Sequence, residues 1–78
     1  MRRTYAIVIE DAGDNFSAYA PDVPGCAATG ATVEETIAQL REALEFHFEG
    51  LEGHGEPIPE PRAHVATIAV GLPAPLAH

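Results

Sequence analysis

The chain has 78 residues, of which 46% are hydrophobic and 21% charged, a composition typical of one globular domain and not of a disordered chain. No apolar run approaches the roughly 20 residues that a membrane-spanning helix requires, and the single cysteine cannot form an internal disulfide, so we expect a cytoplasmic protein. The formal net charge of −8 disfavours direct binding of nucleic acid, but it does not disfavour a basic protein partner.

A strand pattern opens the chain. Apolar side chains in residues 2–10 alternate with the period of two that is typical of strands, with Tyr5, Ile7 and Ile9 on one face and Ala6 and Val8 on the other. Residues 11–15 are rich in turn formers, and residues 16–20 continue as a second strand. The first twenty residues therefore predict a β-hairpin.

Prolines interrupt this pattern after the hairpin. Pro21 and Pro24 lack the N–H that a central strand requires, so residues 21–25 should form a connection or lie on a sheet edge. Residues 26–30 fit a short third strand that ends in a turn at Gly30.

A long helix is predicted from Thr32 onward. Thr32 and Glu35 match the capping box, in which the threonine oxygen accepts the backbone N–H three residues later. Gly53, Gly55 and Pro57 should end the helix. Between these limits one apolar stripe recurs at spacings of three and four, and it should pack on the sheet: Val33, Ile37, Leu40, Leu44, Phe48 and Leu51.

The last part of the chain combines a proline-rich connection with one more strand pattern. Residues 56–63 suit extended or polyproline II geometry, and residues 64–70 are expected to form a fourth strand. Residues 73–78 are expected to be a loose tail, so a single domain spans residues 1–72.

The helix face opposite the apolar stripe is acidic. Arg41 is the one cation among its glutamates, which are Glu34, Glu35, Glu42, Glu45, Glu49 and Glu52. Such a face is most often simply solvated. However, Glu45 and Glu49 lie four residues apart and repel one another, which a cationic partner would relieve. Phe46 lies away from the stripe, either as a harmless exposed aromatic or as part of a contact surface.

Cys26 and the histidines are the residues that catalysis or metal binding could use. A catalytic thiolate needs a nearby histidine, cation or helix N-terminus, and Cys26 stands six residues before the expected helix cap, so we predict a buried core residue. His47 and His54 are too far apart along a helix to hold one ion; the other histidines are His64 and His78. We therefore predict no catalytic residues, no metal, no cofactor and no enzyme activity.

Residues 19–61 carry a fairly specific combination of motifs. They contain Pro-Asp-x-Pro-Gly-Cys at residues 21–26, a glycine and a threonine before Glu-Glu, and a helix with Glu-Ala that closes into a Gly/Pro-rich segment. In this order the motifs resemble the HicB-like antitoxin family. The resemblance implies an α+β fold like a truncated RNase H: a three-strand antiparallel meander, one helix packed on one face, and a fourth strand beside the first (β-β-β-α-β).

The resemblance also implies a partner. Many members of this family bind and silence a HicA toxin, a small basic protein that cleaves RNA. Longer members add a DNA-binding segment, whereas eight residues follow the expected fourth strand here. The chain is therefore expected to be a stand-alone interaction domain that does not bind operator DNA.

Two groups of residues are assigned roles on this basis. A rigid corner that places the third strand is expected from fixed proline φ angles, a permissive glycine and an aspartate that bonds neighbouring backbone: Pro21, Asp22, Pro24, Gly25 and Cys26. The candidate contacts with a protein partner are Tyr19, Glu45, Phe46 and Glu49.

Two other functions stay open. The chain could be an orphan oligomeric domain, with a scaffold or small-ligand role and no toxin. A metal-dependent nuclease would need carboxylates from several elements; Glu10 and Asp11 with Glu34 or Glu35 are available, but residues 64–70 offer none.

Self-association is expected in either case. A chain of this length buries only about 60% of its unfolded surface, and one helix covers only one face of the sheet. Ala6, Val8 and Tyr19 make the other face partly apolar, so we predict a homodimer or a tetramer.

Overall fold

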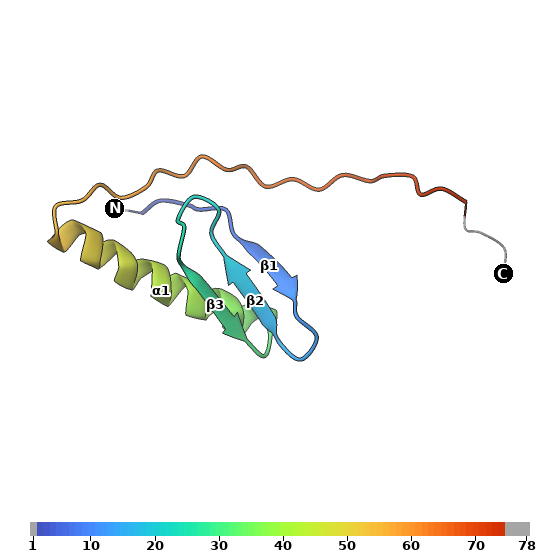
Figure 1. Ribbon diagram of the computed structural model, residues 1–78, viewed down its shortest axis with the longest axis horizontal. Coiled ribbons are helices and arrows are strands. Elements are labelled where there is room, and N and C mark those ends of the chain that lie inside the picture. The colour runs from blue at the N-terminus through green and yellow to red at the C-terminus, as the bar shows by residue number, and fades with distance from the viewer. Residues whose placement is uncertain (1, 75–78) are drawn as a thin grey trace.

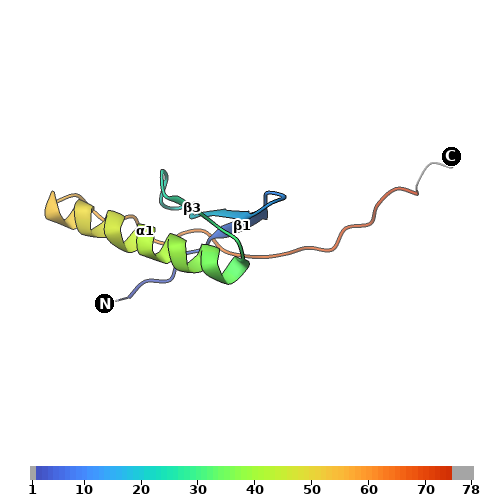
Figure 2. The ribbon, with the colours of Figure 1, turned by 90° about the horizontal axis from the view of Figure 1, so that it is seen from below.

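The computed structural model describes residues 2–74 (Figure 1). Strands β1 (Val8–Asp11), β2 (Phe16–Tyr19) and β3 (Ala27–Gly30) form an antiparallel sheet in that order. Helix α1 (Val33–Gly53) packs on one face of this sheet, chiefly against β3 and β2, so the body has two layers (Figure 2). The predicted α+β class, three-strand meander and single helix are confirmed.

The β1–β2 hairpin closes through local hydrogen bonds. The Ala12 N–H donates to the Asn15 carbonyl at 2.8 Å, and the Gly13 N–H donates to the Asp11 carboxylate at 2.9 Å. Gly13 has a φ of 96°, which glycine adopts without the steric cost that other residues meet. Regular pairing begins at Val8, later than the predicted start at residue 2, although Tyr5 and Ile7 pack against the core as their alternation indicates.

Both ends of α1 lie where the sequence predicts them. The Glu35 N–H donates to the Thr32 hydroxyl at 3.0 Å, which caps the first turn. At the other end Gly55 has a φ of 70°, and the Glu56 N–H donates to the Leu51 carbonyl at 2.8 Å. This left-handed glycine satisfies the last carbonyls and turns the chain away from the helix.

The core is small and lies between α1 and the sheet. Its buried apolar residues are Ala18, Ala20, Val23, Cys26, Leu40 and Leu44. The Ile9–Ala18–Ala28 row of the sheet faces α1, because these paired residues all pack in or on the core. Val33, the first residue of the predicted stripe, is 36% exposed and contributes little.

Gly30 serves a different purpose from the predicted turn. It ends β3 with an ordinary backbone, but a Cβ at this position would lie 2.7 Å from the Thr36 hydroxyl and 2.8 Å from the Thr36 backbone nitrogen. Thr36 is completely buried, and its hydroxyl donates to the Thr32 carbonyl at 2.7 Å. The absence of a side chain at Gly30 therefore lets α1 approach the end of β3.

The predicted fourth strand is not formed within residues 2–74. Residues 64–70 are extended and exposed, and they pair with no strand in this part of the chain. Figure 1 shows this segment leaving the body, and the radius of gyration is 16.6 Å against about 11.5 Å for a compact chain of this length. The fourth strand beside β1 therefore stays a prediction, because strand-forming residues gain ladder hydrogen bonds only beside another strand.

Candidate interaction surfaces

The corner between β2 and β3 is built from two consecutive turns. The Val23 N–H donates to the Ala20 carbonyl at 3.0 Å, and the Cys26 N–H donates to the Val23 carbonyl at 3.4 Å. Gly25 has a φ of 90°, as its predicted role requires. The turns place Val23, only 1% exposed, in the core. The sequence reasoning missed this residue, although an apolar side chain between two loop prolines is a usable signal.

Asp22 binds a distant segment and not the neighbouring backbone that the sequence suggested. One oxygen of its carboxylate accepts the backbone N–H groups of Arg62 and Ala63, each at 2.9 Å. The hydrogen bond from Ala63 has the largest effect on the pKa of the Asp22 carboxyl, which it lowers. The hydrogen bond from Arg62 and the charge of the Arg62 side chain lower this pKa further. The corner thus anchors the chain after the proline-rich connection.

Cys26 is a free, buried thiol at the end of the corner. Its burial raises the pKa of the thiol, so the neutral form predominates at physiological pH. The predicted core role is confirmed, because Cys26 is one of the buried apolar residues of the core. A neutral and enclosed sulfur is also a poor nucleophile.

The outer surface of α1 is acidic and carries one large exposed aromatic. Phe46 is 78% exposed, and it lines a shallow depression together with Glu42, Glu45 and Glu49. The glutamates of the predicted acidic face are all exposed. The structure thus brings three of the four candidate partner contacts together.

Tyr19, the fourth candidate, lies on the other side of the molecule. Its neighbour Ala18 is buried beneath α1, and successive strand residues point to opposite faces. Tyr19 is 43% exposed and pairs with Val8 and Ala27 on the face of the sheet that α1 leaves open. One flat partner surface could not contact both Tyr19 and Phe46.

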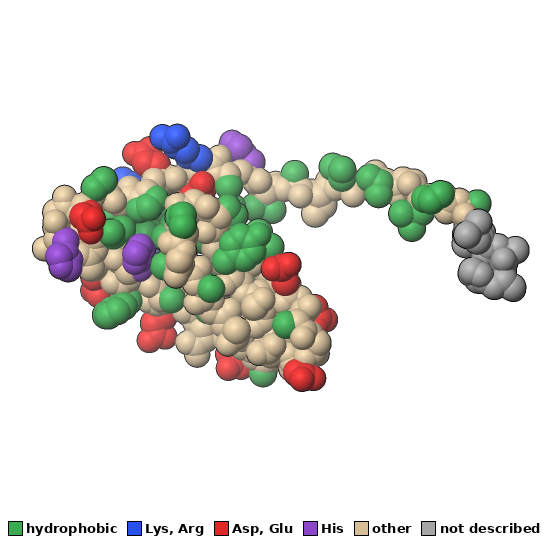
Figure 3. All heavy atoms as spheres, viewed as in Figure 1, with side chains coloured by type: hydrophobic (Ala, Val, Ile, Leu, Met, Phe, Trp, Pro, Cys, Tyr) green, Lys and Arg blue, Asp and Glu red, His purple; other side chains and the backbone are tan. Residues whose placement is uncertain are grey.

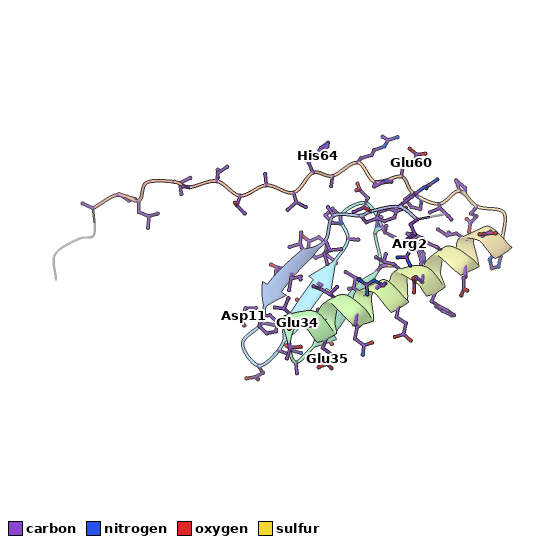
Figure 4. The ribbon with its side chains drawn as sticks, turned by 180° about the vertical axis from the view of Figure 1, so that it is seen from behind. Arg2, Asp11, Glu34, Glu35, Glu60 and His64 are labelled. Carbon is purple, nitrogen blue, oxygen red and sulfur yellow. The ribbon has the colours of Figure 1, made fainter. Side chains whose placement is uncertain are left out.

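The carboxylates considered for metal binding do not form a ligand set. Figure 4 shows Asp11, Glu34 and Glu35 toward the same end of the body, where β1 ends and α1 begins. Across residues 2–74, however, no three His, Cys, Asp or Glu side chains are grouped so that they could hold a metal ion.

The histidines are dispersed. The His47 ring lies 6.2 Å from the Phe48 ring, and His54 Nδ1 lies 2.8 Å from the Gly50 carbonyl at the end of α1. His64 is on the extended segment, while His78 lies outside the described residues.

A groove of about 710 Å³ separates the N-terminal segment 2–7 from α1. Ile7, Ile37 and Leu44 are among its apolar lining residues, and Tyr5 packs against Phe48 with ring centroids 5.3 Å apart. Three cations also line the groove: Arg2, Arg3 and Arg41. The sequence reasoning did not anticipate this groove, since it assigned residues 2–7 to a paired strand.

The described part of the chain contains no helix that is both long and apolar enough to cross a membrane. The extended segment 64–74 is apolar but is not a helix (Figure 3).

Proteins of similar sequence come from bacteria, an archaeon and a phage. A 14.9 kDa protein of Haemophilus phage HP1, from the rep-hol intergenic region, is 39% identical over 56 residues; the match covers 72% of this chain and 42% of the phage protein. A UPF0150 protein of Thermoplasma acidophilum is 31% identical over 62 residues, covering 80% of this chain and 90% of that protein. A UPF0150 protein of Synechocystis is 34% identical over 65 residues, covering 82% and 89%.

The fold is also similar to that of a solved structure. One chain of the HicA3 and HicB3 toxin-antitoxin complex matches with a TM-score of 0.65 and 33% sequence identity, over 77% of this chain and 70% of that one. A family model described as a HicB-like antitoxin of bacterial toxin-antitoxin systems matches residues 5–70. The chain belongs to the HicB-like antitoxin family.

Proposed function

We propose that this chain is an antitoxin that binds and neutralises a small, basic, RNA-cleaving toxin of the HicA type. The likeness to a chain of the HicA3 and HicB3 complex supports this pairing. The observation that supports a particular binding surface is the exposed Phe46, which lies among glutamates on the outer surface of α1. The same family membership supports a fourth strand beside β1, completing a truncated RNase H-like sheet.

The charges give the acidic surface a physical reason to meet such a toxin. A protein that cleaves RNA must attract phosphates and therefore carries a basic surface. Opposite potentials speed the encounter, and the formal charge of −8 on this chain repels acidic competitors. Glu45 and Glu49 also repel one another, so a cation placed between them would lower the energy of both.

The pairing is tested by co-expression with a HicA-type candidate, a small basic protein sought in the adjacent reading frame, followed by co-purification and stopped-flow binding at several salt concentrations. We expect a stable complex whose association slows as salt is added. Failure to co-purify would contradict the pairing and favour the alternative of an orphan oligomeric domain. Association that is indifferent to salt would contradict the electrostatic mechanism alone.

Charge reversal with a matched control locates the binding surface. Glu45→Lys with Glu49→Lys should slow association by about tenfold or more and flatten its salt dependence. Asp14→Lys with Glu60→Lys changes the net charge equally, but at exposed positions outside α1. Equal slowing by the two pairs would show that net charge, and not the α1 surface, directs the encounter.

Two aromatic variants then decide between the two faces. Phe46→Ala should speed dissociation about tenfold or more, since buried aromatics at an interface mainly set the lifetime of a complex. Tyr19→Ala should leave the lifetime of the complex unchanged, because Tyr19 lies on the face of the sheet that α1 leaves open. The reverse pattern would move the toxin to the open face of the sheet.

The chain itself should not cleave RNA. Incubation of the purified protein with RNA and Mg²⁺ or Mn²⁺ should give no cleavage. Cleavage that Glu10→Gln with Asp11→Asn abolishes would support the nuclease alternative instead.

A further inference from the structure

Residues 64–72 form an apolar, extended segment that the body does not use. Four of its large side chains are strongly exposed: Val65 by 75%, Ile68 by 84%, Val70 by 68% and Leu72 by 84%. No hydrogen bond joins this segment to the rest of residues 2–74. Figures 1 and 2 both show it pointing away from the two-layer body. Its backbone donors and acceptors are therefore open along its whole length.

The chemistry of the segment fits the edge of a β-sheet. Val65, Thr67, Ile68 and Val70 are β-branched residues, which strands favour. Residues 61–78 contain no Asp or Glu, although the chain has 12 such residues. Two chains with a formal charge of −8 each repel each other, so an uncharged strand is the part that a second copy could accept most easily.

The connection before the segment directs it away from its own sheet. Pro57, Pro59 and Pro61 stiffen this connection and favour extended geometry. The Tyr5 hydroxyl donates to the Pro59 carbonyl, and Asp22 holds the N–H groups of Arg62 and Ala63. The chain is thus fixed as far as residue 63 and projects straight outward from there.

β1 offers an edge that can receive such a strand. It is one of the two edge strands of the sheet, and its far side pairs with no strand among the described residues. Helix α1 packs chiefly on β3 and β2, which leaves the groove between residues 2–7 and α1 open. Side chains of an added strand that point toward α1 would extend the apolar layer formed by Ile7, Ile9 and Ile37.

We propose that residues 64–72 pair with β1 of a second copy of this chain, and that the second copy returns its own segment in the same way. This reciprocal exchange closes the dimer by a two-fold axis and uses the same surface twice. It also covers two exposed edges and two apolar segments. The proposal does not depend on the toxin pairing.

Nuclear Overhauser effects in a sample mixed from ¹⁵N-labelled and ¹³C-labelled chains test the exchange directly. We expect intermolecular contacts between the amides of Val8–Asp11 in one chain and residues 66–70 in the other, in a dimer confirmed by sedimentation equilibrium. Contacts confined within one chain would overturn the proposal in favour of its own fourth strand. A monomer at tens of micromolar, contacts that arise only after toxin is added, or a dimer joined only through the Tyr19 face would also overturn it.

A matched pair of variants provides a second readout. Ile68→Asp and Phe46→Asp each replace a strongly exposed apolar side chain by a charge, so neither should disturb the body. We expect Ile68→Asp, and likewise Thr67→Pro, to weaken the dimer about 100-fold or more, while Phe46→Asp leaves the dimer Kd unchanged. Far-UV circular dichroism checks that α1 is intact in each variant. A dimer that tolerates both Ile68→Asp and Thr67→Pro would rule the exchange out.

Discussion

The body and the extended segment of this chain contain similar strand-forming residues, but only the strands of the body are paired. β1, β2 and β3 are four residues each, shorter than the run at residues 64–72, and yet each has a partner. The segment is more apolar than β1 and remains exposed. Composition therefore indicates that a segment can be a strand, but it does not determine whether that segment is paired.

The connections that lead into the two regions differ in their backbone geometry. The turns around Gly13 and Gly25 adopt left-handed backbone angles and reverse the chain within a few residues. The connection after α1 contains three prolines and is held by Asp22 at its far end. A tight turn returns a strand to its neighbour, whereas this stiff connection leads residues 64–72 away from the body (Figure 1).

The largest expected difference in unfolding free energy is between shortening a side chain in the core and shortening one in residues 64–72. Leu40 is 1% exposed at the centre of the core, so Leu40→Ala should lower the free energy of unfolding by about 2–5 kcal/mol. Ile68 is 84% exposed, and Ile68→Ala should change the unfolding of the monomer by no more than about 0.5 kcal/mol. Urea unfolding at low protein concentration measures both. A loss of more than about 2 kcal/mol for Ile68→Ala would place the segment in the core of its own chain.

A second pair of variants compares two glycines within the body. Gly30→Ala should destabilise the fold by about 1–3 kcal/mol, because the new Cβ would meet the backbone nitrogen of Thr36 at 2.8 Å. Gly50→Ala meets nothing within 4 Å inside α1 and should stabilise it by about 0.5–1 kcal/mol. The same unfolding experiment measures both. Equal and small effects would mean that α1 does not depend on its close approach to β3.

Much of the body could be predicted because its signals are local. The cap at Thr32 and Glu35, the left-handed Gly55 and the hairpin turn each depend on residues a few positions apart. The acidic face with Phe46 followed from helical period alone.

The features that sequence reasoning missed depend on contacts between distant residues. The binding of Arg62 and Ala63 by Asp22 spans forty and forty-one residues, and no local pattern specifies it. Gly30 resembles a turn residue in the sequence. No local pattern indicates that Thr36, which is polar and completely buried, lies directly against it in the fold. The separation of Tyr19 from Phe46 likewise required knowing which face of the sheet α1 covers.

Cys26→Ala should have a smaller effect, limited to stability. The loss of a small buried side chain should cost about 1 kcal/mol of unfolding free energy. Co-purification with the toxin should be unchanged, because the neutral thiol takes no part in the proposed surface. Loss of toxin binding in a variant that still folds would show instead that Cys26 takes part in binding.

The smallest expected effect is local and depends on pH. Since the folded pKa of Asp22 is lowered, its contact with Arg62 and Ala63 is complete above the ordinary aspartate pKa and is lost as the pH falls through the lower folded value. An acid titration followed by the amide shifts of these two residues should therefore have its midpoint below about pH 4. Asp22→Ala should remove the transition and leave α1 intact, whereas a midpoint at or above the ordinary value would contradict the contact.

Hydrogen exchange at two protein concentrations tests most directly whether the segment is completed only by another chain. At low concentration the amides of residues 65–72 should exchange as in an unstructured peptide, while those of α1 are protected. At high concentration the segment and the free edge of β1 should gain protection together, with α1 unchanged. Protection of residues 65–72 in the dilute monomer, or no protection at any concentration, would contradict this account.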